Sequence, residues 1–360
     1  MKILIDIGHP AHVHLFKNFA KEMLIKGHQI LFTCREKEFE TNLLKSENFD
    51  FISFGRKYRS IKGKAFGLVK FNYRLFKVAL KFKPDIFLSA GSMYAAQVSF
   101  IYRKPHICFE DTFNFEQVRL YKSFTKTILT SNYKHPYLGK NNIKYKGYHE
   151  LAYLHPKRFK PNNKILKELK LSENENYVLI RFVAWSASHD INHDGIDYKN
   201  KIKAIKEFSK YAKVFVSSEK ELTDELKQYK LPTSPKDIHS VMFYACLIFG
   251  ESATMVTEGA VLGVPGVYLD DTGRCYTKEL EEKYGLVYNF SESKSDQEKA
   301  ISKGIDILKK LDNKKTWVNK KNKILNDKID VTAFLIWFIE NYPKSINVMS
   351  ENPEFQNKFK

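Results

Sequence analysis

The segment from Phe249 to Asp271 has the clearest chemical character in this 360-residue chain. It reads as a small-residue turn at Gly250, a short helix with hydroxyl groups near its start, and then a buried strand. The start of a helix binds anions, because its backbone N–H groups and its dipole both favour negative charge. Ser252 and Thr254 lie at that position, and the carboxylate of Glu258 follows at a spacing suited to gripping a ribose. The segment therefore predicts a nucleotide-sugar site.

Three histidines follow the first predicted strand, which contains Asp6. After a turn at Gly8 come His9, His12 and His14, ahead of a predicted helix. Histidine is the side chain best suited to take a proton near neutral pH, so this loop can supply a general base or a phosphate contact. The spacing also fits metal ligands, but alternate residues of an extended loop point in opposite directions, which disfavours a metal site. A structural role, capping the helix, is the remaining interpretation.

Two further loops of the first half follow predicted strands. Gly91 allows close approach of the backbone, and Ser92 can donate to a substrate oxygen. The next strand ends in Glu110 and Asp111, either of which can act as a general base or hold a sugar hydroxyl. Alternatively, Asp111 is the N-cap of the following helix.

Polar side chains also follow two strands of the second half. Arg181 and His189 can neutralise a diphosphate leaving group, with Ser186 and Ser188 in a phosphate-facing turn between them. Ser217 ends the next strand and is expected to line the same cleft. The sequence contains neither G-x-x-x-x-G-K-[ST] nor G-x-G-x-x-G, so P-loop and dinucleotide sites lose their main support.

These loops connect short β-branched or aromatic segments that alternate with amphipathic ones. The alternation predicts an α/β fold with parallel sheets covered by helices on both faces. In the first half we predict strands at 3–7, 29–33, 51–54, 86–89, 106–109 and 127–130, and helices at 16–26 and 65–82. In the second half we predict strands at 177–183, 214–216, 247–249 and 267–269, and helices at 198–211, 298–311 and 331–342.

The alternation lapses around residues 145–163, which marks the connection between two domains. We therefore predict one domain over residues 1–150 and a second over residues 151–330. Open parallel sheets bind ligands at the carboxyl ends of their strands, so two such domains in tandem create a cleft between those ends.

Composition limits the class of protein. Hydrophobic residues make up 43% of the chain and charged residues 28%, as in globular proteins. The 60 basic and 41 acidic residues give a formal charge of +19, which favours an acidic partner, although a Lys-rich background composition accounts for it equally well.

The four cysteines are scattered, which argues against a disulfide framework or a structural zinc site. Without a signal peptide or an apolar run of roughly 20 residues, a cytoplasmic protein is expected, with the inner membrane face as an alternative.

The segment from Arg56 to Lys83 contains ten basic residues and no acidic one. Aromatic and aliphatic residues interleave with them, a pattern that suits the surface of an anionic membrane. Alternatively, the apolar stripe packs on the sheet while the lysines are solvated. Nucleic acid is disfavoured as a partner, because no recognised nucleic-acid-binding motif accompanies the charge.

Taken together, the segments 8–13, 89–92, 109–111 and 250–265 resemble those of GT-B glycosyltransferases. The chain is identified as a member of a family of predicted glycosyltransferases still filed as a domain of unknown function, DUF354, over most of its length to about Glu340. More distantly it is similar to MurG-type N-acetylglucosaminyltransferases and to UDP-N-acetylglucosamine 2-epimerases. In place of MurG's glycine-rich turns, the chain has His9-Pro10-Ala11 and Ala184-Trp185-Ser186.

The resemblance implies two Rossmann-like, doubly wound domains facing across a cleft. The N-terminal one would bind the acceptor, the C-terminal one the nucleotide diphosphate-sugar, and a helix over 331–345 would cross back to the first. The chemistry would need neither a metal nor another cofactor. His12 would match the loop histidine that serves as base, Ser252 and Thr254 would lie near the diphosphate, and Glu258 would grip the ribose.

Three functions follow as hypotheses. The leading one is inverting sugar transfer from a nucleotide diphosphate-sugar to a lipid-linked or cell-surface glycan, with His12, Glu110 or Asp111 as the base. The second is a UDP-sugar 2-epimerase that uses Glu110, Asp111, Glu150 and His189. The third is a non-catalytic, basic protein that binds a membrane or nucleic acid.

Overall fold

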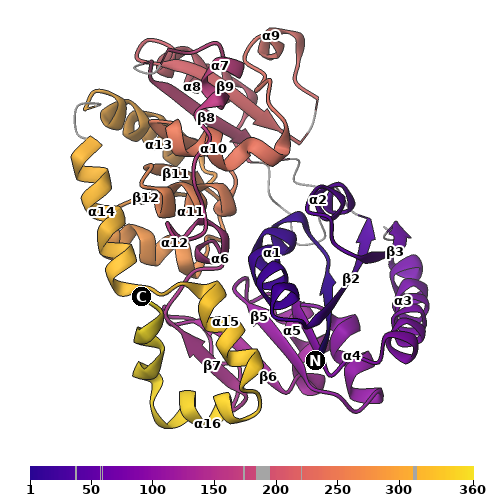
Figure 1. Ribbon diagram of the computed structural model, residues 1–360. Coiled ribbons are helices and arrows are strands. Elements are labelled where there is room, and N and C mark those ends of the chain that lie inside the picture. The colour runs from indigo at the N-terminus through magenta and orange to yellow at the C-terminus, as the bar shows by residue number, and fades with distance from the viewer. Residues whose placement is uncertain are drawn as a thin grey trace. The chain divides into compact units, whose positions relative to one another are not determined.

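The computed structural model describes residues 1–36, 39–56, 58, 60–172, 175–183, 195–219, 221–310 and 314–360 (Figure 1). These residues form two compact units. The first comprises residues 1–158 and 328–360, and the second residues 159–327. The first unit thus extends beyond residue 150, where the sequence predicted its end, and takes in the whole C-terminal segment.

The first unit is built on a seven-stranded sheet with the order β3-β2-β1-β4-β5-β6-β7. All its strand pairs are parallel. The strands are β1 (Lys2–Ile7), β2 (Gln29–Glu36), β3 (Phe51–Arg56), β4 (Ile86–Ala90), β5 (His106–Glu110), β6 (Thr127–Ser131) and β7 (Asn142–Tyr145). β1, β4, β5 and β6 are almost entirely buried, as expected of the central strands of a parallel sheet that helices cover on both faces.

Helices pack on this sheet through their apolar faces. They are α1 (Pro10–Ile25), α2 (Glu40–Ser46), α3 (Ile61–Phe82), α4 (Met93–Ile101), α5 (Phe115–Tyr121), α6 (Leu151–Leu154), α15 (Val331–Glu340) and α16 (Lys344–Glu351), with the 3₁₀ turns η1 (Lys122–Phe124) and η5 (Pro353–Phe359). α15 contacts both α1 and α6, and Phe334 stacks on Tyr145 of β7 at 6.0 Å between ring centroids. The last helices therefore complete the core of the first unit.

The second unit has a five-stranded parallel sheet with the order β12-β11-β10-β8-β9. Its strands are β8 (Tyr177–Phe182), β9 (Lys213–Ser218), β10 (Leu247–Gly250), β11 (Gly266–Leu269) and β12 (Val287–Phe290). Its helices are α7 (Lys164–Glu168), α8 (Tyr198–Phe208), α9 (Asp224–Lys227), α10 (Ile238–Tyr244), α11 (Ala253–Leu262), α12 (Cys275–Glu279), α13 (Lys294–Leu308) and α14 (Lys314–Asp327), with the 3₁₀ turn η2 (Pro235–Asp237) and the π-helical turn η3 (Leu280–Tyr284). The predicted α/β class with two parallel sheets is confirmed.

Each sheet has a point where the strand order reverses direction. In the first unit it lies between β1 and β4, and in the second between β8 and β10. In open α/β sheets, ligands bind at the carboxyl ends of the strands that flank such a point. The ends of β1 and β4, at Ile7 and Ala90, flank the first point, and the ends of β8 and β10, at Phe182 and Gly250, flank the second.

The first helix differs from the sequence-based prediction. We expected a histidine-bearing loop and a helix from residue 16, but α1 begins at Pro10, and His12 and His14 lie in its first turns. Proline is favoured at the first helical position, since its missing N–H is not needed there. His9 is the N-cap, and its Nδ1 accepts a hydrogen bond from the backbone N–H of Ala11 at 3.2 Å.

The close approach of β10 to β8 generates a prediction about stability. Gly250 has φ +140°, and a Cβ atom there would overlap the carbonyl oxygen of Arg181. Gly250→Ala should lower the free energy of unfolding by about 3 kcal/mol through overlap and backbone strain. Gly27→Ala is the matched control, because Gly27 also has positive φ but has open space around it, and it should cost about 1 kcal/mol. Equal losses in urea denaturation would contradict this account.

Candidate functional site

The turn between β10 and α11 has the geometry that the sequence predicted for it. Ser252 is the N-cap of α11, and its hydroxyl accepts a hydrogen bond from the N–H of Met255 at 3.3 Å. Thr254 is partly exposed in the first turn, and its hydroxyl bonds to no described residue. The helix ends at Gly263 in the left-handed conformation. This arrangement leaves one hydroxyl and the first N–H groups of α11 available to an oxygen-rich ligand.

Glu258 is almost completely buried and is bonded to a histidine of a neighbouring helix. It is 5% exposed, and its Oε1 accepts a hydrogen bond from Nε2 of His239, on α10, at 3.0 Å. His239 is also 5% exposed and packs edge-on against the ring of Phe159. The sequence could not reveal this pairing, because the two residues come from different helices. It fixes the orientation of the Glu258 carboxylate.

Arg181 is engaged within the second unit. Its guanidinium donates to Ser217 Oγ at 2.9 Å and to Glu219 Oε1 at 2.7 Å. These bonds bring together two residues that the sequence assigned to one site, Arg181 and Ser217, and place them beside Gly250, which pairs with Arg181 in the sheet. Ser186, Ser188 and His189 lie outside the described residues.

Glu251 holds the two flanks of the segment between β8 and α8. It is 3% exposed and accepts hydrogen bonds from the N–H groups of Val183 at 2.7 Å and Ile196 at 2.6 Å. Glu251 thus ties Val183, at the end of β8, to Ile196, just ahead of α8. A carboxylate that accepts buried backbone N–H groups is strongly favoured in that position.

In the first unit, His12 is oriented by the turn that precedes it. Its Nδ1 accepts a hydrogen bond from the N–H of Gly8 at 3.3 Å, so the neutral ring carries its proton on Nε2. His9 has the same arrangement toward Ala11. Both rings therefore present an N–H donor at Nε2. His14 is 9% exposed, and its ring packs against Tyr153 at 5.4 Å, so it belongs to the interior of the unit.

Buried polar bonds also fix the neighbouring loop at Gly91. Ser92 is the N-cap of α4, and its hydroxyl donates to Asp6, which also forms a buried ion pair with Arg35 at 2.7 Å. Gly91 has φ +61° and accepts a hydrogen bond from Gln117. Ser92 is therefore committed to the fold, and Asp6 joins β1, β2 and α4 at the switch point.

Ser89 and His106 lie nearby, and the distance between their side chains is that of a catalytic nucleophile and its base. Ser89 Oγ lies 2.8 Å from His106 Nε2, and His106 Nδ1 lies 2.9 Å from the hydroxyl of Thr125. Ser89 and His106 are fully buried, and burial lowers the pKa of His106 to about 3. Because both side chains are fully buried, the pair serves to hold together β4, β5 and the residue that ends η1.

Glu110 is also committed to the fold. Its Oε1 accepts from the N–H and hydroxyl of Thr112 and from the N–H of Phe113, and its Oε2 accepts from Tyr121. Burial raises the pKa of Glu110, in opposition to the hydrogen bonds that it accepts. These contacts make Glu110 the carboxylate that closes the turn between β5 and α5.

Asp111 and His149 form a pair that the sequence did not reveal. His149 Nδ1 donates to Asp111 Oδ2 at 2.9 Å, and the imidazole packs edge-on against Phe109. This bond keeps the proton on Nδ1 in the neutral ring, so Nε2 carries the lone pair. Nε2 is buried and bonds to no described residue. Asp111 is thus bonded to a histidine, whereas the N-cap of α5 is Asn114.

Carboxylates surround this imidazole. Burial lowers the pKa of His149, but Asp111, Glu150 and Glu110 outweigh that effect and hold the pKa above its ordinary value. The hydroxyl of Tyr145 is also buried without a partner among the described residues, and burial with Asp111 and Glu150 raises its pKa well above 10. The carboxyl ends of β5 and β7 therefore share an acidic, partly unsatisfied polar cluster.

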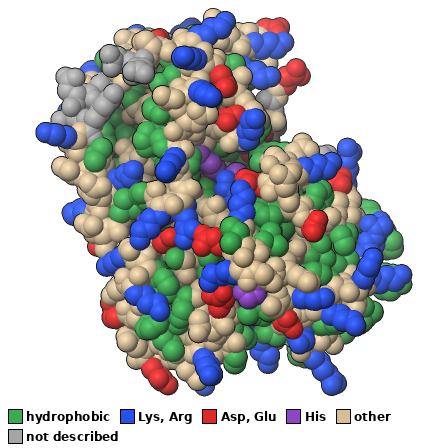
Figure 2. Space-filling view, viewed as in Figure 1, with side chains coloured by type: hydrophobic (Ala, Val, Ile, Leu, Met, Phe, Trp, Pro, Cys, Tyr) green, Lys and Arg blue, Asp and Glu red, His purple; other side chains and the backbone are tan. Residues whose placement is uncertain are grey.

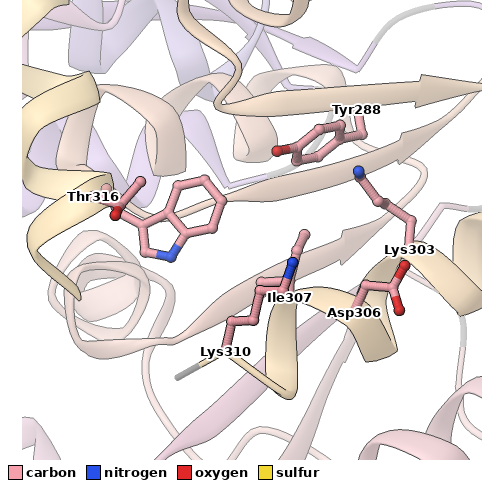
Figure 3. Close-up of a pocket in the computed structure, with 7 residues that line it drawn as sticks. Tyr288, Lys303, Asp306, Ile307, Lys310 and Thr316 are labelled. Atoms are coloured by element: carbon pink, nitrogen blue, oxygen red, sulfur yellow. The ribbon is translucent and has the colours of Figure 1, made fainter. Parts of the chain in front are cut away.

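The described residues contain no group of three or more His, Cys, Asp or Glu side chains arranged to hold a metal ion. Among the described helices, none combines the length and the apolar character needed to cross a bilayer. A cavity of about 240 Å³ lies between α13, α14 and β12 in the second unit (Figure 3). Its walls include Tyr288, near the start of β12, and the last turns of α13, so it lies by the amino ends of the strands, away from α11.

Comparison with known proteins assigns the chain to a family. Residues 1–332 match the family described as "Protein of unknown function (DUF354)", and the chain belongs to it. An uncharacterized protein of Methanocaldococcus jannaschii, MJ0665, is 25% identical over 291 residues, which cover 78% of this chain and 83% of that protein.

Solved structures share the fold at low identity. A putative UDP-N-acetylglucosamine 2-epimerase from Listeria monocytogenes has a TM-score of 0.66 at 13% identity, with 91% of this chain and 95% of that one covered. The UDP-GlcNAc 2-epimerase from Neisseria meningitidis bound to UDP-GlcNAc has a TM-score of 0.62 at 14% identity, with 90% and 98% covered. The spinosyn rhamnosyltransferase SpnG complexed with thymidine diphosphate has a TM-score of 0.62 at 10% identity, with 94% and 100% covered. The fold is thus that of GT-B glycosyltransferases and UDP-GlcNAc 2-epimerases.

The Asp111–His149 pair generates a pH-dependent prediction. Asp111 raises the pKa of His149 in the folded protein. The pair therefore contributes its full stabilisation at pH values below the unfolded-state pKa of His, which is about 6.5. That stabilisation is lost as the pH rises through the pKa of His149 in the folded state. Asp111→Asn should therefore lower the pKa of His149, measured by NMR titration of the histidine ring protons. It should also destabilise the protein more at pH 5.5 than at pH 8.5. An unchanged titration would show that the pair does not form.

Proposed function

We propose that the chain is a nucleotide-sugar enzyme that transfers a sugar from a nucleotide diphosphate-sugar to a hydroxyl of a lipid-linked or cell-surface glycan, without a metal. The observation that carries this proposal is the hydroxyl-bearing start of α11 at the switch point of the second sheet. The shared fold with proteins that bind UDP-GlcNAc or thymidine diphosphate supports it.

In this proposal the second unit binds the donor. The first N–H groups of α11 and the hydroxyl of Thr254 bind the diphosphate, and they stabilise the negative charge that develops on it as the sugar leaves. Arg181, held by Ser217 and Glu219, adds positive charge at the same edge of the sheet. Glu258, oriented by His239, is the group proposed to bind the ribose.

The first unit supplies the acceptor side. His12 and His149 are the candidate bases there, and their geometry differs. The neutral His12 ring presents an N–H at Nε2, whereas Asp111 leaves the Nε2 lone pair of His149 ready to take a proton from a hydroxyl. A base that removes the acceptor proton permits direct displacement, which inverts the anomeric centre. His149→Gln should then reduce the rate of sugar transfer by roughly 100-fold. The reduction in rate caused by His12→Ala in the same assay shows how much of the proton removal depends on His12.

A 2-epimerase is the second candidate, because the solved epimerases share the fold and because Glu110, Asp111 and Glu150 lie around His149. This reaction eliminates the nucleotide and adds it back, which needs acid and base groups but no acceptor. Incubation with a UDP-sugar alone separates the two functions. An epimerase converts the UDP-sugar to its 2-epimer without an acceptor, whereas a transferase releases UDP and moves the sugar only when an acceptor is present.

The first experiment is a thermal-shift screen against UDP-, GDP-, CDP- and dTDP-sugars, followed by turnover with and without glycan acceptors. A donor at 100 times its Kd should stabilise the protein by about 2.7 kcal/mol. One nucleotide class should raise Tm above the others. If none of the four raises Tm and none is turned over, the proposed function is wrong.

Thr254 offers the sharpest test of the donor site. Thr254→Val removes a hydroxyl with no described partner, so stability should stay the same while the Kd for the donor rises roughly tenfold, measured by calorimetry. Thr257→Val is the matched control on the same helix. The Thr257 hydroxyl is buried and donates to the carbonyl of Ala253 at 2.8 Å, so this variant should lose about 1 kcal/mol of stability and keep its affinity. Equal Kd values for the two variants would place the donor elsewhere.

A further inference from the structure

Helix α3 of the first unit has two apolar faces. The inner face packs in the core, where Phe71, Leu75 and Ala79 are 2% exposed or less. They contact buried residues of β1, β4 and α4, including Leu4 and Phe87. This face confirms that one apolar stripe of the helix packs on the sheet.

The outer face is also apolar and is largely exposed among the described residues, with Tyr58 packed edge-on against Phe66 alone, at 5.8 Å between ring centroids. Phe66 is 61% exposed, Val69 71%, Tyr73 59% and Leu80 52%. Their spacing of three, four and seven residues places them in one stripe along the helix, because 3.6 residues make a turn. The stripe lies opposite the packed face. Folding of the unit does not account for four large apolar side chains in this position, so the face is suited to a partner.

Basic side chains border this outer stripe. Lys70 lies over the ring of Phe66 at 5.9 Å, and Lys77 lies over the ring of Tyr73 at 4.7 Å. Lys62 and Lys81 are exposed at the two ends. The sequence from Arg56 to Lys83 contains no acidic residue. Figure 2 shows hydrophobic and basic side chains side by side at the edge of the molecule where Figure 1 places α3.

We propose that this outer face of α3 docks on an anionic lipid bilayer, with the helix lying parallel to the membrane surface. The apolar side chains would enter the boundary between headgroups and acyl chains, while the lysine stems extend along them and bring the ammonium groups to the lipid phosphates. Nucleic acid fits this face less well, because it would cover the lysines but leave the exposed phenylalanine, valine and leucine without an apolar partner. The inference is independent of the sugar chemistry.

The test is co-sedimentation of the full chain with vesicles of phosphatidylcholine alone and of phosphatidylcholine with phosphatidylglycerol. The protein should bind only the anionic vesicles, and added salt should weaken the binding. Lys70→Gln and Lys77→Gln should each lower the partition coefficient about fivefold. Val69→Asp should lower it further. Lys203→Gln and Val318→Asp are the matched controls, since both residues are exposed but lie in the second unit, and they should leave binding unchanged.

Each result decides the proposal. Equal binding to both vesicle types, no binding to either, or equal losses in the α3 and control variants would overturn it. Tighter binding to duplex DNA than to anionic vesicles, with both abolished by the lysine substitutions, would assign the face to nucleic acid and overturn it as well. Val69 and Lys77 are exposed, so thermal unfolding should be the same for their variants as for the unaltered chain, whereas Lys70 also donates a hydrogen bond to the hydroxyl of Tyr58 at 2.8 Å, so only the Lys77 and Val69 variants enter this comparison. Early unfolding of Val69→Asp or Lys77→Gln would instead show that the outer face contributes to the fold, again contrary to the proposal.

Discussion

The contact between Gly250 and the carbonyl of Arg181 is the constraint on which the second unit depends. A side chain at this position would overlap the neighbouring strand, so only glycine lets β10 and β8 pair in register to their ends. That pairing places Glu251 where it accepts the N–H groups on both flanks of the loop after β8, and places Ser252 as the cap of α11. One glycine thus sets the positions of Glu251 and Ser252 at the switch point.

In the first unit, buried polar bonds hold the loops at the carboxyl edge of the sheet in place. Asp6 with Arg35 and Ser92, Glu110 with Tyr121, and Ser89 with His106 fix the loops at the carboxyl edge of the sheet. Buried polar groups of this kind are costly unless every bond is made, and most of these are fully satisfied. The buried Nε2 of His149 and the hydroxyl of Tyr145 are among the exceptions, and they lie together at the carboxyl edge of this sheet.

The sequence predicts most of the architecture and part of the site. Continuous apolar runs such as Ile3–Ile7 locate the central strands, and the S-x-T spacing locates the start of α11. Short edge strands such as β7 and β12 were missed, because Asn142–Tyr145 and Val287–Phe290 are only partly buried and carry a weak pattern. The start of α1 was missed because Pro10 was interpreted as part of a loop.

Side-chain partners lie beyond the reach of sequence reasoning. Asp111 and His149 are far apart in the chain and meet only because β5 and β7 end at the same edge of the sheet. Glu258 and His239 meet through the packing of α10 on α11. The same limitation applies to Glu110, whose residue type fits a base but whose hydrogen bonds make it part of a turn. Residue type and spacing thus indicate which edge is functional, and tertiary contacts decide which side chains are available there.

The central claim is that the start of α11 binds the diphosphate of a nucleotide. Amide NMR of the ¹⁵N-labelled chain, titrated with UDP, GDP, CDP and TDP, tests it most directly. One nucleotide should shift the amides of residues 251–256 in a saturable way and leave those around the cavity at Tyr288 unmoved. Saturable binding that leaves the α11 amides unchanged, or no binding of any of the four, would contradict the account.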